Sequence, residues 1–215
     1  MSTGELIGLI VYGMTVGVAL AAPIGPINIE IIRRGIRDGY IHGWMVGLGA
    51  VSVDTVYALI IVSGFASFAD RESVRVVLYI AGGFMLGWVG WSSMKTALRG
   101  IEGSAGDKPK PRGRSYITGV LMAAFNPMGI VYWLTVGAGL AADAVSRVGK
   151  SGAPVLVVGV TLGILAWVTT LSVIAQVSRR FVTGNGMRWV TGVSGAIIMA
   201  FGLFFFWQAL ATLTG

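Results

Sequence analysis

Residues 6–32 read LIGLIVYGMTVGVALAAPIGPINIEII, a run that is apolar enough to cross a membrane but carries two prolines within one turn. A transmembrane helix needs about 20 residues to span ~30 Å of hydrocarbon. Pro23 and Pro26 each remove a backbone hydrogen bond, and Gly25 between them permits backbone angles that other residues avoid. We therefore expect a transmembrane helix that is interrupted within residues 21–28 and restarts at Pro26, a favourable first helical position.

Five further apolar runs of similar length follow, near residues 43–67, 75–95, 116–141, 154–178 and 189–212. They are too long for sandwich strands and lack the alternation of barrel strands, so each is expected to be a helix that satisfies its own backbone groups in lipid. Of the 215 residues, 12% are charged, about half the share of a soluble domain. The predicted class is an all-α membrane protein with six transmembrane helices.

The basic residues alternate between the connections. The first, third and fifth connections carry three, six and three of the 16 Lys and Arg residues, and the termini carry none. Basic loops stay in the cytoplasm, so both termini are predicted to lie outside it, in a multi-pass protein of the inner (plasma) membrane. Because these cations lie in short loops between apolar runs, the net charge of +7 does not indicate nucleic-acid binding.

The polar, Pro- and Gly-rich stretch at residues 101–114 divides the chain into a first three-helix repeat (1–100) and a second one (115–215). An odd number of spans per repeat inverts the second relative to the first, as in many secondary transporters. The second repeat has its own predicted break at FNPMG (125–129), where Asn126 can cap a helix that begins at Pro127. Breaks in corresponding helices indicate a binding site near the midplane, although prolines that merely kink packed helices are the alternative.

Asp54 lies near the middle of the second span with no basic residue nearby in the sequence. A central Asp costs roughly 2.5–3.5 kcal/mol on insertion scales, so it should face the bundle interior, where it is a candidate for binding an ammonium group or a proton. The alternative is a neutral Asp that is hydrogen-bonded between helices and serves packing. Trp167 occupies the equivalent level of the fifth span, and either lines a cavity or packs in the core. Glu30 is four residues before Arg34, which a solvated ion pair at the headgroup level explains as well as a site role does.

Other chemistry is disfavoured by composition. The chain has no Cys and one His, so disulfides, thiol chemistry and soft-metal sites are not predicted, and neither is a cofactor. It contains no HExxH motif or Ser-His pair of the kind that enzymes use, so we predict that the protein is not an enzyme.

Several segments resemble one family. The stretch APIGPINIEIIRRGIRDGYIHGWMVGLGAVSVDTVYALIIVSG (22–64) resembles the first module of the lysine exporter (LysE/RhtB) family of amino-acid exporters, and FNPMGIVYWLTV (125–136) resembles its fourth helix. The resemblance implies that Pro23, Gly25, Pro26, Asn126 and Pro127 shape the pathway and that Asp54 is the acidic site. The turn reads PIGP where many relatives have PGP, which leaves the substrate open.

The resulting hypothesis is a proton-coupled antiporter that exports amino acids or similar small zwitterions. The half-helix N-termini would bind the carboxylate, while Asp54 and Glu30 carry the coupling proton. An inorganic cation exporter, for example for cadmium, is the alternative within the same superfamily. Besides the substrate and membrane lipids, a second copy of the chain is a conceivable partner, because Gly-rich faces allow close helix packing. The predicted substrate-binding residues are Pro23, Gly25, Pro26, Asn28, Asp54, Asn126, Pro127 and Trp167.

Overall fold

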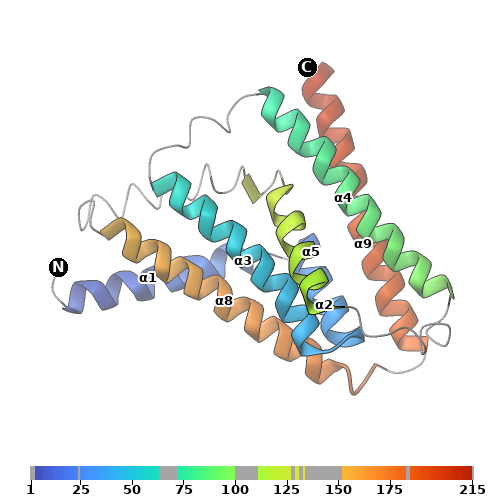
Figure 1. Cartoon of the computed structure of the whole chain (residues 1–215), viewed down its shortest axis with the longest axis horizontal. Helices are drawn as coiled ribbons and strands as arrows, with labels where there is room; N and C mark the ends of the chain where they lie inside the picture. The colour runs from blue at the N-terminus through green and yellow to red at the C-terminus, as the bar shows by residue number, and fades with distance from the viewer. Residues whose placement is uncertain are drawn as a thin grey trace.

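The computed structural model describes residues 3–23, 25–62, 72–99, 111–126, 129–130, 133, 152–182 and 185–214, and within these ranges all regular secondary structure is helical. The helices shown in Figure 1 are α1 (Thr3–Ala21), α2 (Pro26–Arg37), α3 (Tyr40–Val62), α4 (Glu72–Arg99), α5 (Arg112–Ala124), α8 (Gly152–Ser178) and α9 (Asn185–Thr214). The all-α prediction is thereby confirmed. The end of the predicted second span, and most of the fourth after Asn126, lie outside the described residues.

Within the described ranges, four helices are long and apolar enough to cross a membrane: α1, α3 as far as Ile61, α8, and α9 as far as Leu213. Large apolar side chains are exposed on several helices, among them Phe84, Leu203 and Trp207. Exposed apolar surface on this scale is unfavourable in water and is expected where helices face lipid. The chain is therefore a multi-pass membrane protein.

Helices α4 and α9 pair in opposite directions through glycines, on one side of the molecule in Figure 1. A Cβ on Gly90 would lie 2.7 Å from the Gly195 carbonyl oxygen, and one on Gly83 would lie 3.1 Å from that of Gly202. Small residues let transmembrane helices approach this closely. Gly87, which sequence spacing also places on the packed stripe, differs: a Cβ there would meet nothing within 4 Å.

Two further close pairs join helices from different halves of the chain, with each pair running in the same direction (Figure 1). Helix α1 lies against α8, where Gly13 meets Gly159. Helix α5 lies against α3, where a Cβ on Gly119 would collide with the Val46 carbonyl oxygen. The short helix α2 contributes Ile29 to the apolar cluster of α4 and α9, and Ile31 to the larger cluster of α3 and α8. It therefore lies between the two groups of helices.

The helix ends that flank the three most basic connections lie at one end of the bundle, which we call the basic end (Figure 1). There the Arg34 guanidinium at the end of α2 reaches Ser115 at the start of α5. The Tyr40 amide at the start of α3 donates to the Gln176 side chain near the end of α8. Arg188 at the start of α9 donates to a carbonyl oxygen near the end of α4. The described helix ends next to connections one, three and five are thus neighbours in space.

Candidate functional site

The first helix interruption lies between Ala21 and Pro26. Helix α2 restarts with Gly25 as its N-cap and Pro26 in its first turn, and the Ile29 amide donates to the Gly25 carbonyl oxygen. The helix is thus interrupted at the position predicted from the two prolines.

Asn28 stabilises this interruption from within. Its Nδ2 atom donates to the carbonyl oxygens of Ala21 (2.9 Å) and Pro23 (3.0 Å). Carbonyl groups at the end of a helix lack intrahelical partners, and in lipid such groups need an internal donor. The structure therefore gives Asn28 a role within the chain, in addition to the substrate-binding role predicted from sequence.

The second interruption follows α5. That helix ends at Ala124, and the Ile130 amide donates to the Asn126 carbonyl oxygen at 3.1 Å, which begins a new helical turn at Asn126. The same backbone pattern follows Gly25 in the first interruption, where the amide four residues later donates to the Gly25 carbonyl oxygen. The Asn126 side-chain oxygen has no partner among the described residues, so the side-chain cap expected from the sequence is not formed within that part of the chain. Pro127 itself lies outside the described residues.

Asp54 is half-buried on α3 and has a partner that the sequence did not indicate. Its Oδ1 atom accepts a hydrogen bond of 2.9 Å from Trp133 Nε1. One turn further along α3, the Tyr57 hydroxyl donates to the Ala124 carbonyl oxygen at 3.0 Å. The acid on α3 is therefore linked to the segment around the second interruption.

The first interruption shares its surroundings with this acid. Trp133 is buried in the larger apolar cluster, and Ala21, Ile27 and Tyr57 pack against that cluster. Residues that flank the first interruption and residues that contact or neighbour Asp54 thus meet around one core.

Two predicted site residues carry a buried polar atom that has no hydrogen-bond partner among the described residues: Asn126 Oδ1 and Trp167 Nε1. A buried polar group without a partner costs about 1–3 kcal/mol, so such atoms call for an explanation. The Asn126 oxygen is a hydrogen-bond acceptor and the Trp167 indole nitrogen is a donor. Ser172 and Thr191 also have unpartnered buried hydroxyl groups.

The structure places Glu30 in a different environment from the solvated one considered from the sequence. Its side chain is completely buried rather than solvated at the headgroup level, and it pairs with two arginines of its own helix. Arg33 donates to both carboxylate oxygens at 2.8 and 2.6 Å, and Arg34 donates to Oε1 at 2.6 Å. The i,i+4 pair with Arg34 is therefore present, but it lies on α2 inside the bundle and not in a loop, because α2 continues to Arg37. A carboxylate buried there without cations would be too costly.

A second ion pair closes the turn between α2 and α3. Arg37 Nε and Nη2 each donate to the Asp38 carboxylate at 2.7 Å. Burial opposes ionisation of Asp38, but the hydrogen bonds and charge of Arg37 outweigh it and hold the pKa of that carboxyl below its ordinary value. This pair lies next to the buried network but does not reach α5.

Comparison with known proteins identifies the family of this chain. Residues 18–209 match the family described as LysE type translocator. The chain belongs to the LysE family of translocators. It is 29% identical over 203 residues to a putative amino acid efflux protein of Bacillus subtilis, covering 94% of this chain and 97% of the relative.

More distant relatives carry related names. The chain is 26% identical to the threonine efflux protein of Escherichia coli K12, over 86% of this chain and 91% of that protein. It is 36% identical to the arginine exporter protein of Pectobacterium atrosepticum, over 40% of this chain and 41% of that protein. No solved structure matches. In the described part of this LysE translocator, no three His, Asp or Glu side chains gather to hold a metal ion. The names of these relatives concern amino acids and do not favour the cadmium alternative.

Sequence reasoning missed two parts of the translocator's interior. Trp133 was not singled out, because an indole in an apolar span is ordinary and its contact with Asp54 bridges 79 positions. The alternation of basic residues predicts that Arg33 and Arg34 lie in a solvated connection, whereas in the structure both are buried on α2. The available signal was Glu30 itself, since an acid with arginines three and four residues later can pair with both on one helix face.

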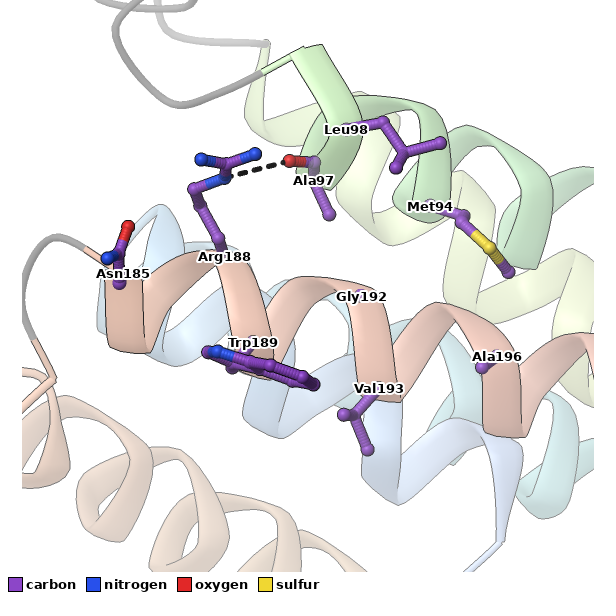
Figure 2. A pocket seen from close by; sticks show the side chains of 9 residues that line it. All are labelled: Met94, Ala97, Leu98, Asn185, Arg188, Trp189, Gly192, Val193 and Ala196. Carbon is purple, nitrogen blue, oxygen red and sulfur yellow. Dashed lines mark hydrogen bonds between the residues drawn. The ribbon is translucent and has the colours of Figure 1, made fainter.

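The translocator also has a groove of about 550 Å³ where the end of α4 meets the start of α9, at the basic end (Figure 2). Arg188 Nε donates across it to the Ala97 carbonyl oxygen at 3.2 Å, and Trp189 beside it is 73% exposed. Apolar side chains, including Met94, Leu98 and Val193, line the rest. The groove contains none of the predicted site residues and is separate from the core around Asp54.

Proposed function

We propose that this LysE translocator exports amino acids or closely related small zwitterions across the plasma membrane, in exchange for protons. The observation that carries this proposal is the meeting, around one buried core, of two helix interruptions and the membrane-embedded Asp54. The relatives' names, which concern amino acid, threonine and arginine efflux, support the same substrate class. A transport function fits the family and does not require catalysis.

In this proposal the substrate carboxylate binds at the interruptions. The first amide groups of a helix have no intrahelical partners and carry a partial positive charge, which suits an anion. Pro23, Gly25 and Pro26 create this geometry before α2, and Asn126 with Pro127 creates it after α5. Trp167 Nε1, a buried donor without a partner among the described residues, adds a hydrogen bond to the carboxylate.

Asp54 and the Asn126 side-chain oxygen attract the substrate ammonium in this scheme. Asp54 also exchanges the coupling proton, because its described hydrogen bond comes from a neutral indole and no described cation forms an ion pair with it. Glu30 stays a prediction as a second proton carrier. Two arginines hold its carboxylate, which favours a role in organising α2.

The two halves are proposed to be inverted repeats, with residues 1–100 and 115–215 joined by the linker 101–114. In such a repeat, α1 of the first half corresponds to α5 of the second, and α3 corresponds to α8. The α1–α8 and α5–α3 contacts are then equivalent, and both are close, parallel and rich in glycine. Exchange of the halves would map the antiparallel pair of α4 and α9 onto itself. These contacts support alternating access by rocking of one repeat against the other.

The basic end is proposed to face the cytoplasm, with both termini on the opposite side. The groove between α4 and α9 would then lie at the cytoplasmic headgroup level. Arg188 beside the exposed Trp189 is the kind of residue pair that is enriched at this level. Membrane lipids are accordingly the proposed neighbours of this surface.

Transport by the purified protein in proteoliposomes tests the proposal. A panel of labelled amino acids is assayed with and without an imposed pH gradient, for the wild type, Asp54→Asn and the matched control Asp38→Asn, whose acid lies in the α2–α3 turn. We expect gradient-dependent transport of at least one amino acid, loss of gradient dependence in Asp54→Asn, and near wild-type transport in Asp38→Asn. Undiminished coupled transport by Asp54→Asn would refute the role of Asp54, and no transport of any amino acid would refute the substrate class.

A further inference from the structure

The buried network of α2 consists of Glu30, Arg33 and Arg34 with Ser115 and Thr118 of α5. It lies at the basic end, and Asp54 lies deeper in the bundle. The depth of the network in the membrane can be measured along α3, which starts at the basic end with Tyr40. Gly43 packs against the Ile31 carbonyl oxygen and Gly35, which flank the network's arginines in sequence. At 1.5 Å per residue, Gly43 is about 5 Å along α3 and Asp54 about 21 Å. A solute that moves between the basic end and Asp54 must pass the level of the network.

The network contains two kinds of bond. The ion pairs of Glu30 with Arg33 and Arg34 lie within α2. The contacts with the second half are hydrogen bonds to neutral hydroxyl groups of α5: Arg34 Nη1 donates to Ser115 Oγ at 2.8 Å, and Nη2 donates to Thr118 Oγ1 at 3.1 Å.

The two kinds of bond respond differently when α2 moves away from α5. If α2 and α5 separate, every ion pair moves with α2 and no charge loses its partner. Of the network's polar contacts, only the two to the hydroxyl groups of α5 break, and water that enters from the basic end replaces them. A buried ion pair between the halves would be far harder to open, because separation would leave single charges behind.

We propose that Arg34, with Ser115 and Thr118, is the latch that closes the substrate path at the basic end. This inference rests on the proposed transport function, since it assigns the barrier that must open for a substrate to reach Asp54 from that side. Glu30 and Arg33 hold the Arg34 guanidinium in position. The structure represents the state in which the basic end is closed.

The absence of cysteine from the chain allows a direct test. Met122 is 2% exposed and follows Ser115 and Thr118 on the same face of α5, one turn nearer the membrane centre. Met122→Cys therefore provides a single thiol directly behind the latch. The rate at which a water-soluble maleimide labels this thiol is measured in nanodiscs, where no transport is needed for the readout.

Three variants are compared in the Met122→Cys background. Ser115→Ala/Thr118→Ala removes the hydroxyl groups and leaves the ion pairs of α2 intact, and Arg34→Gln removes the guanidinium. Arg37→Gln is the matched control on the same helix, because Arg37 pairs with Asp38 and does not reach α5. We expect labelling to become about tenfold faster or more in the first two variants, as for loss of charge-assisted hydrogen bonds, and to stay at the reference rate in the control.

The double alanine variant is decisive if Arg34→Gln fails to fold. Reference-rate labelling in that variant overturns the latch. Equal acceleration in all three variants overturns it too, because it would show general loosening of α2. Labelling is independent of substrate, so its outcome can be distinguished from that of the transport assay. If labelling is accelerated as expected but no amino acid is transported, only the proposed substrate class is refuted.

Discussion

At the scale of single residues, the interior combines polar groups whose partners lie within the chain with polar groups that have none among the described residues. The donors of Asn28 are used on the first interruption, and Asp54 accepts from Trp133. Asn126 Oδ1 and Trp167 Nε1 are buried without such partners. Because an unpartnered buried group destabilises the fold, both atoms are candidates to pair with the substrate in the transport function proposed above.

Trp167→Phe tests this explanation. The change removes the indole N–H and keeps an aromatic ring, so we expect the KM of the exported amino acid to rise about tenfold, as for the loss of a hydrogen bond to a charged group. The thermal unfolding midpoint should stay equal or rise, since a buried donor without a partner is removed. Trp44→Phe is the control, because the Trp44 indole already donates to Thr169 at 3.1 Å. An unchanged KM combined with a lower midpoint would assign Trp167 to packing alone.

At the scale of elements, the first span is two helices because its prolines cannot continue one. Pro23→Ala/Pro26→Ala restores both missing donors, and each proline in a helix interior costs about 3 kcal/mol. We expect α1 and α2 to become continuous, the protein to remain folded, and transport in proteoliposomes to fall below a tenth of the wild-type rate. Pro154→Ala, in the first turn of α8, is the control that should transport normally. Normal transport by the double variant would mean that the interruption is not part of the pathway.

Close helix contacts depend on glycine at specific positions only. A Cβ at Gly119 would collide with the backbone of α3, whereas a Cβ at Gly87 would meet nothing within 4 Å. We expect Gly119→Ala to destabilise the protein by about 2 kcal/mol through overpacking, and Gly87→Ala to be neutral or slightly stabilising. Thermal unfolding in detergent measures both. Equal midpoints for the two variants would show that α3 and α5 are not held as closely as described.

At the scale of the whole molecule, the basic connections share one end. Single cysteines at Gly113, exposed in the first turn of α5, and at Thr3, exposed at the start of α1, report on the two ends. In intact cells, a membrane-impermeant thiol reagent should label Thr3→Cys and leave Gly113→Cys unlabelled until the membrane is disrupted. The reverse pattern would invert the proposed orientation.

The membrane class, the helical fold and the helix interruption were predictable because they depend on local properties. Hydrophobic length decides whether a segment can cross lipid, and a proline removes its hydrogen bond whatever surrounds it. The FNPMG motif likewise predicted that a helix ends before Asn126, although Pro127 lies outside the described residues. The roles of the predicted site residues stay predictions.

What only the tertiary structure decided is which polar groups meet. Sequence spacing allowed a pair between Glu30 and Arg34 but could not show that α2 places it inside the bundle against Ser115, 81 positions away. Nor could it show that Trp133 donates to Asp54. The physical reason is that hydrophobicity and backbone geometry act within a segment, whereas burial of a charge and its partner depend on how separate helices pack.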